Sequence, residues 1–151
     1  VSWNRCNDFV RELNKLTGKR FRLPTEAEWE YACRGGKKSR GYKYSGSNTI
    51  GDVAWYWDNG PKEIHPVGTK SPNELGIYDM SGNVEELCQD WYGDYSSAAQ
   101  TNPTGASSGT DRVSRGGSRM SYAKSCRSSN RGFATPGSIY DSVGLRLALS
   151  E

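Results

Sequence analysis

The sequence predicts a single α+β domain rich in loops, and three observations favour this fold class. The chain has 151 residues, close to the size of one domain and sufficient to bury a core. Apolar residues make up only 34%, but five Trp and nine Tyr supply large side chains that each bury about 150–250 Å². Eighteen glycines interrupt the chain, which favours turns and irregular segments over a helical bundle. No internal repeat or domain boundary divides residues 1–151.

Charge and hydropathy exclude two classes of partner. The formal net charge is only +3 and its charges are interspersed, which is not the footprint of nucleic-acid binding. No apolar run approaches the roughly 20 residues that cross a bilayer. We therefore expect neither a nucleic-acid partner nor membrane insertion.

The four cysteines leave two alternatives open. Cys6, Cys33, Cys88 and Cys126 are scattered without CxxC spacing, which disfavours a zinc site. An even, scattered set is compatible with two disulfides in an exported protein, and this predicts an extracytoplasmic location (periplasm, cell surface or exterior). The same residues would equally serve as reduced, buried thiols.

Two helices are predicted in the first quarter of the chain. Residues 2–17 begin at Ser2, a good N-cap, and end before Gly18. Their apolar residues recur at helical spacing: Trp3, Cys6, Val10, Leu13 and Leu16. Thr25-Glu26-Ala27-Glu28 is a capping box, which predicts a second helix over 26–33 that ends at the glycines 35–36.

The remainder is predicted to form short strands separated by long loops. Residues 37–75 are rich in Gly, Asn, Ser and Pro, and we expect ordered loops held by aromatic residues. Short strands of a small antiparallel sheet are predicted within 76–95 and at 112–115, with a flexible polar loop at 96–110. Residues 119–143 are expected to be irregular, and 143–149 to form a final strand.

Five segments, in order, resemble the formylglycine-generating-enzyme (sulfatase-modifying factor) family. They are RLPTEAEWEYACRGG (22–36), HPVGTKSPNELGIYDMSGNVEEL (65–87), DWYGD (90–94), RVSRGGS (112–118) and VGLRLAL (143–149). The resemblance implies a C-type-lectin-like fold with two helices, small twisted antiparallel sheets and long irregular loops. It also implies that 1–151 is one such domain lacking the family's usual N-terminal portion, and that Arg115, Arg131 and Arg146 tie its loops together by hydrogen bonds.

The same resemblance predicts that the family's oxidase chemistry is missing. The enzymes oxidise a sulfatase cysteine with two copper-binding cysteines that follow the RGGS motif. Here Ser121 takes the first position and Cys126 the second, and a hydroxyl does not replace a thiolate on Cu(I). We therefore expect no copper and no catalytic residues. A branch that uses non-haem iron needs two histidines, and His65 is the only one here.

A calcium site is the second expectation that the resemblance carries. The segment 79–86 resembles the family's structural calcium loop, with ligands from the Asp79 side chain, the Gly82 and Val84 carbonyls and the Glu86 carboxylate. Mixed carboxylate and carbonyl oxygens suit Ca²⁺. The alternative is a hydrogen-bonded turn in which Asp79 accepts backbone N–H groups.

The polar C-terminal stretch is the candidate binding surface. In this fold eight residues of 119–142 are expected on one exposed surface: Arg119, Ser121, Tyr122, Phe133, Ser138, Ile139, Tyr140 and Asp141. Tyr, Ser and Gly are typical of binding surfaces, because rigid aromatics give area and small polar groups adapt. Related proteins, the variable proteins of diversity-generating retroelements, place their variable positions here. The alternative is a solvated loop with no ligand.

Three functions remain open. The first is a non-catalytic ligand-binding or display module that binds protein or glycan through this surface. The second is a sulfatase-modifying oxidase, and the third is a structural subunit of an envelope assembly. Separately, carboxylates at Asp52, Asp58, Asp90 and Asp94 flank aromatic residues, as in a sugar-binding groove, although Asx-turns would give the same pattern.

Overall fold

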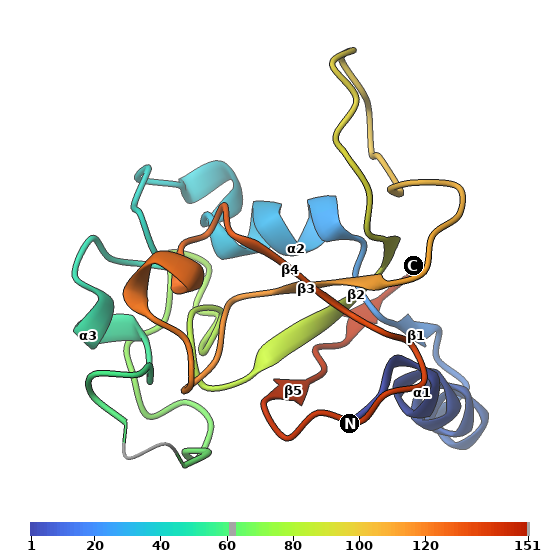
Figure 1. Ribbon diagram of the computed structural model, residues 1–151, viewed down its shortest axis with the longest axis horizontal. Helices are drawn as coiled ribbons and strands as arrows, with labels where there is room; N and C mark the ends of the chain where they lie inside the picture. Colours follow the sequence, from blue (N-terminus) through green and yellow to red (C-terminus); the bar gives the residue numbers. More distant parts are fainter. Residues whose placement is uncertain (61–62, 151) are drawn as a thin grey trace.

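A four-stranded sheet lies at the centre of the computed structural model, which describes residues 1–60 and 63–150. Its strands have the order β4-β3-β2-β5. They are β2 (Glu85–Trp91), β3 (Arg112–Arg115), β4 (Arg131–Ala134) and β5 (Val143–Gly144). The helices α1 (Trp3–Thr17) and α2 (Glu26–Cys33) lie on opposite sides of this sheet (Figure 1).

The first helix forms for the local reasons that its sequence indicates. The Ser2 hydroxyl accepts a hydrogen bond from the Arg5 N–H at 3.3 Å, and Gly18 ends the helix with φ of 67°. Because Cys6 lies on the inward side, α1 contributes to a cluster with buried residues of the sheet and its neighbourhood: Leu23, Leu87, Ala134 and Val143.

The second helix packs on the other face of the sheet. Both halves of the predicted capping box are present, with Thr25 accepting from the Glu28 N–H and Glu28 accepting from the Thr25 N–H. Trp29 and Cys33 pack against Met80, Cys88 and Val113. Successive residues of β2 therefore point to different cores, Leu87 towards α1 and Cys88 towards α2.

One pair of strands departs from the antiparallel sheet that the sequence predicts. β2, β3 and β4 are antiparallel neighbours, but β5 runs parallel to β2, with Glu85 opposite Val143. After β4 the chain crosses to the far edge of the sheet before it runs beside β2. The sheet is therefore mixed.

Two expectations about the C-terminal part were wrong in detail. Residues 119–143 contain β4 and the 3₁₀ helix η2 (Ala123–Cys126), so they are not wholly irregular. Residues 143–149 form two short strands and not one, because β5 pairs with β2 whereas β6 (Ala148–Leu149) pairs with β1 (Phe21–Arg22). The residues between them turn from one sheet to the other.

Loops predominate in the described residues of 37–75 (37–60 and 63–75), as expected, and two short helical turns lie at 36–38 and 50–53. These are the 3₁₀ helix η1 (Gly36–Lys38) and α3 (Ile50–Val53). Tyr44 and Val53 pack with Cys126 in a third cluster, which connects these loops to η2. By contrast, the loop between β2 and β3 projects from the body of the molecule (Figure 1).

Of the two alternatives for the cysteines, the structure has reduced, buried thiols. Cys6, Cys33, Cys88 and Cys126 are free thiols and all four are buried. They serve the three clusters as small apolar side chains. None of the helices within the described ranges combines the length and apolar character that crossing a bilayer requires.

Candidate functional site

The first group of the eight predicted surface residues lies around the 138–141 loop. Ile139, Tyr140 and Asp141 are exposed, as expected. Arg119 is only 6% exposed, and its guanidinium donates to the Asp141 carbonyl at 3.2 Å and pairs with the carboxylate at 3.4 Å. The buried Arg119 side chain thus anchors this loop to the body of the domain. Ser138 donates its N–H to Thr135, which tightens the turn before the exposed residues.

A second group forms at the start of η2. The Tyr122 side chain is 58% exposed, and its ring lies 5.5 Å from the ring of Trp57. The Trp57 N–H donates to the Ser121 carbonyl at 3.0 Å, and the Ser121 hydroxyl accepts from the Ser118 N–H. Trp57 is therefore part of this surface although it is far away in sequence. An aromatic residue in a polar loop was the signal that could have identified it.

Phe133 stands apart from both groups. It projects from β4 and is 62% exposed, and its ring lies 5.2 Å from that of Tyr92. The described contacts thus join the eight residues into three groups. The structure exposes the predicted aromatic side chains but shows no contact that links Phe133 to the others within the described residues.

The two positions that would hold copper in the enzymes have unsuitable chemistry here. Cys126 is fully buried beside Tyr44 and Val53, and burial raises the pKa of its thiol to about 12. A neutral thiol among apolar groups is a poor metal ligand. Ser121 offers only a hydroxyl that already accepts a hydrogen bond. The chain therefore supplies no thiolate pair at this place.

In the predicted calcium loop, both carboxylates already have partners. Asp79 accepts the Gly68 N–H at 2.7 Å. Glu86 is 5% exposed, accepts from the Trp29 indole at 2.7 Å, and takes two hydrogen bonds from Arg146 at 2.6 and 2.7 Å. The guanidinium of Arg146 thus occupies the place of a cation beside Glu86. Calcium binding through Asp79, Gly82, Val84 and Glu86 stays a prediction, and such an ion would compete with Arg146.

The three arginines connect distant segments, as expected. Arg115 is 1% exposed and donates to the carbonyls of Ser128 and Asn130 and to Glu30. Arg131 binds Glu26 through two hydrogen bonds and the Gly93 carbonyl through a third. Their planar guanidinium groups suit several simultaneous acceptors.

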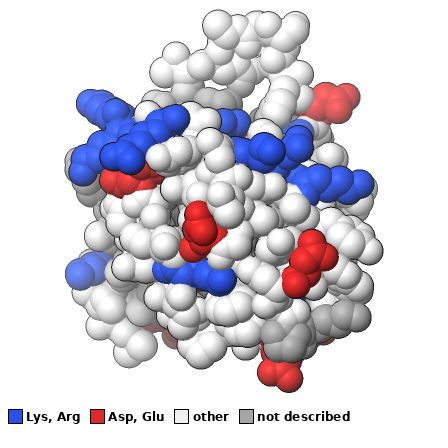
Figure 2. Space-filling view, turned by 90° about the vertical axis from the view of Figure 1, so that its left-hand side faces the viewer, with Lys and Arg blue, Asp and Glu red and all other residues white. Residues whose placement is uncertain are grey.

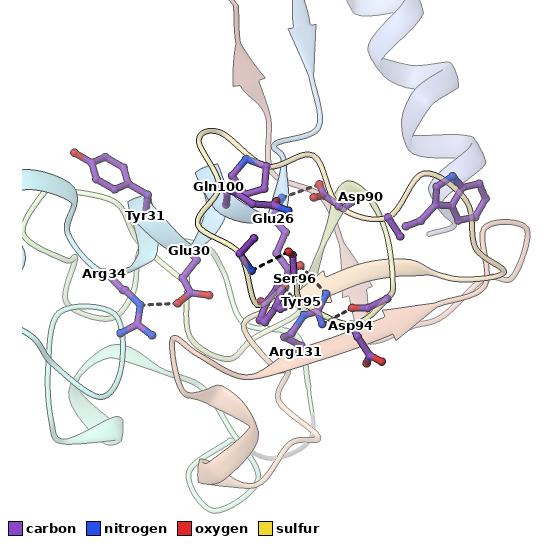
Figure 3. Close-up of a pocket in the computed structure, with 17 residues that line it drawn as sticks. Glu26, Glu30, Tyr31, Arg34, Asp90, Asp94, Tyr95, Ser96, Gln100 and Arg131 are labelled. Carbon is purple, nitrogen blue, oxygen red and sulfur yellow. Dashed lines mark hydrogen bonds and ion pairs between the residues drawn. The ribbon is translucent and has the colours of Figure 1, made fainter.

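A pocket of about 790 Å³ lies between α2 and the projecting β2–β3 loop. Glu26, Glu30, Tyr31 and Arg34 of the helix line one side, and residues from 90–106 line the other (Figure 3). None of the eight predicted surface residues lines it. Of the four carboxylates beside aromatics that the sequence pattern singled out, Asp90 and Asp94 line this pocket, whereas Asp52 and Asp58 do not.

Comparisons with known proteins agree with this architecture. The formylglycine-generating enzyme of Streptomyces coelicolor (strain ATCC BAA-471 / A3(2) / M145) is 36% identical over 98% of this chain and 51% of its own length. Treponema denticola variable protein 1 has a solved structure with a TM-score of 0.79 and 42% identity, covering 85% of this chain and 47% of that one. PvdO from Pseudomonas aeruginosa has a TM-score of 0.85 and 31% identity, over 100% of this chain and 60% of that one.

These similarities confirm the predicted C-type-lectin-like fold class. The chain spans about half the length of the curated relatives it matches, 50% and 51% in two of them. The family model for the sulfatase-modifying factor enzyme 1-like domain matches residues 1–151. With its two helices, mixed sheet and RGGS segment, the chain belongs to the sulfatase-modifying factor (formylglycine-generating-enzyme) family.

Proposed function

We propose that this chain is a non-catalytic binding module whose C-terminal loop surface holds a protein ligand. The observation that carries the proposal is the exposure of large side chains on a segment tied to the core. Tyr122, Ile139 and Tyr140 are 58%, 60% and 37% exposed, although the same segment is anchored by Arg119 and Cys126. Exposed aromatic and aliphatic groups on a fixed framework are typical of interaction surfaces.

Similarity to a variable protein supports this proposal. Treponema denticola variable protein 1 is 42% identical to this chain. The resemblance noted in the sequence assigns the variable positions of such proteins to this C-terminal segment. By the same resemblance, the proposed module displays changeable side chains on a constant framework, as a retroelement-diversified protein would.

Basic side chains beside the η2 part of the surface favour an acidic protein over a neutral glycan, whereas the exposed acids Asp58 and Asp141 lie next to Trp57 and in the 138–141 loop. Lys43, Lys124 and Arg127 are exposed, and the Ser128 N–H donates to the Lys43 carbonyl, which brings these segments together. Figure 2 shows the side of the molecule that carries α3 and η2, where Lys and Arg gather in the upper half of the view. Complementary charge speeds encounter and disfavours wrong partners.

The oxidase alternative has less support. It needs two soft sulfur donors, and the chain offers the Ser121 hydroxyl and a buried Cys126 thiol at those positions. Oxygen consumption with copper and a cysteine-containing sulfatase peptide would nevertheless establish it. The third alternative, a structural subunit, predicts co-purification with one fixed partner that does not depend on the exposed tyrosines.

Protein and glycan arrays followed by interferometry test the proposal. We expect a protein ligand whose affinity falls by about tenfold or more in Tyr122→Ala and in Tyr140→Ala, since aromatic anchors carry much of the binding free energy. Phe9→Ala is the matched control, because Phe9 is a half-exposed aromatic on α1. Unchanged affinity in both tyrosine variants would overturn the assignment, and a glycan as the only ligand would correct its class.

A further inference from the structure

The pocket over α2 has a floor of paired charges that is complete without a ligand. Glu26 accepts two hydrogen bonds from Arg131 at 2.7 and 2.8 Å, and Glu30 accepts from Arg34 at 2.7 Å. Arg115 contacts both carboxylates from behind. Figure 3 shows Glu26, Tyr95 and Arg131 drawn together at the centre. Such a floor is fixed before anything binds, which lowers the ordering cost of binding.

Aromatic rings form the walls, and two of them are held in place. The Tyr95 hydroxyl donates to Glu26 at 2.9 Å, and its ring lies 4.0 Å from the Arg131 guanidinium. Trp91 is stacked with Arg112 at 3.3 Å. Tyr31 is 56% exposed at the outer rim, and its ring is turned away from Tyr95 and Arg131 (Figure 3). Rigid aromatic faces can pack against the C–H face of a ligand at low entropic cost.

The charge of the lining argues against anionic ligands. Four carboxylates (Glu26, Glu30, Asp90 and Asp94) face two guanidinium groups (Arg34 and Arg131), a balance of −2 that repels phosphates and other anions. Three of those carboxylates are already engaged, because Asp90 accepts the Glu26 N–H at 2.8 Å in addition to the pairs above. The lining therefore disfavours anionic ligands, and hydrogen bonding has to distinguish a neutral ligand from a cationic one.

The remaining polar groups at the rim both donate and accept hydrogen bonds. Gln100 offers an amide, Asp94 a carboxylate and Arg34 part of its guanidinium. A ligand hydroxyl is donor and acceptor at once and matches such a mixed set. The volume of about 790 Å³ lies within the roughly 300–1,000 Å³ of small-molecule sites.

We propose that the pocket between α2 and the β2–β3 loop binds a neutral sugar of one or two units, stacked on Tyr95 and hydrogen-bonded by Asp94 and Gln100. This site is separate from the C-terminal loop surface. It can therefore exist whether or not that surface binds a protein, and the two proposals fail independently.

Amide chemical shifts of the isotope-labelled chain test the site directly. The probes are neutral hexoses, N-acetylhexosamines and their disaccharides, with arginine methyl ester and inorganic phosphate as charged comparisons. We expect a sugar to shift the amides of 26–34 and 93–106 with millimolar affinity. Tyr95→Leu should weaken binding by about tenfold, the effect of losing one aromatic anchor, whereas Tyr95→Phe should retain most of it. Asp94→Asn should weaken it as well.

Tyr122→Ala is the matched control, because this exposed tyrosine lies outside the pocket and belongs to the other surface. It should leave sugar binding unchanged. Tyr95 is 65% exposed, so Tyr95→Leu should keep the wild-type spectrum outside the pocket and remain interpretable. The proposal is overturned if no sugar in the panel shifts these amides, if Tyr95→Leu binds as the wild type does, or if arginine methyl ester or phosphate binds more tightly than every sugar.

Discussion

Glu26 and Arg131 form a two-pronged ion pair that joins the start of α2 to the start of β4, across 105 positions of sequence. The Glu26 side chain is 6% exposed and that of Arg131 is 16% exposed. Tyr95 and Arg115 contact the same carboxylate. The buried Glu26 carboxylate thus connects α2 with β3, β4 and the projecting β2–β3 loop. The floor of the pocket depends on it.

Removing that charge should cost much more stability than removing an exposed one. Glu26→Gln keeps the shape but leaves Arg131 without its anion and Arg115 with Glu30 alone, and we expect a loss of about 3–5 kcal/mol in the free energy of unfolding. The control is Arg11→Ala, which breaks the exposed Arg11–Asp8 pair of α1 and should cost less than about 1 kcal/mol. Urea denaturation measures both, and similar losses would contradict the network.

Glu28 should make stability depend on acid pH. Hydrogen bonding from Arg22 is the main reason that the pKa of Glu28 falls from 4.5 to about 2. A lowered pKa in the folded state stabilises fully above pH 4.5, and this contribution is lost as the pH falls through about 2. Because the Glu28 side chain is 46% exposed, we expect less than about 1 kcal/mol.

The measurement compares unfolding of the wild type and Glu28→Gln across this range of pH. Their stability difference should be constant near neutral pH and should shrink towards zero in acid. A difference that grows as the pH falls would have the wrong sign and would contradict the assignment to the Arg22 pair.

Two glycines with similar positive φ should respond differently to alanine. Gly82 and Gly68 have φ of 78° and 74°, but a Cβ at Gly82 would overlap the Trp55 carbonyl oxygen, whereas the space at Gly68 is open. Gly68→Ala should cost about 1–2 kcal/mol from the left-handed conformation alone. Gly82→Ala should cost about 2 kcal/mol more, because its neighbours must shift. Equal melting temperatures would contradict the close approach.

Cysteine labelling should find four slow thiols. Burial raises the pKa of Cys33 to about 11 and that of Cys126 to about 12, so little thiolate exists at mildly alkaline pH. A disulfide exchange reagent should therefore react slowly with the folded chain and with four thiols after denaturation. Ser129→Cys, at an exposed position, should add one fast thiol. Finding fewer than four thiols without reductant would indicate disulfides.

Local signals predicted the helices well, whereas long-range pairing limited the rest. Ser2 and the Thr25–Glu28 box act within a few residues, so both helix starts could be identified. β4 was missed because Arg131-Gly132-Phe133-Ala134 lacks a clear alternation, and its strand exists through pairing with β3. The pocket combines α2, β4 and residues from 90–106, and only its carboxylates beside aromatics were visible in sequence.

Calcium binding at 79–86 can be tested by replacing Arg146, whose guanidinium would compete with the ion for Glu86. The sequence predicts Ca²⁺ ligands at Asp79 and Glu86, while the structure pairs Glu86 with Arg146 at 2.6 Å. We expect calorimetry to show tighter Ca²⁺ binding in Arg146→Gln than in the wild type, because the competing guanidinium is gone. Asp79→Asn should weaken binding in both backgrounds. Equal affinity with and without Arg146 would place the ion elsewhere, and no heat of binding in either protein would show that the calcium prediction is wrong.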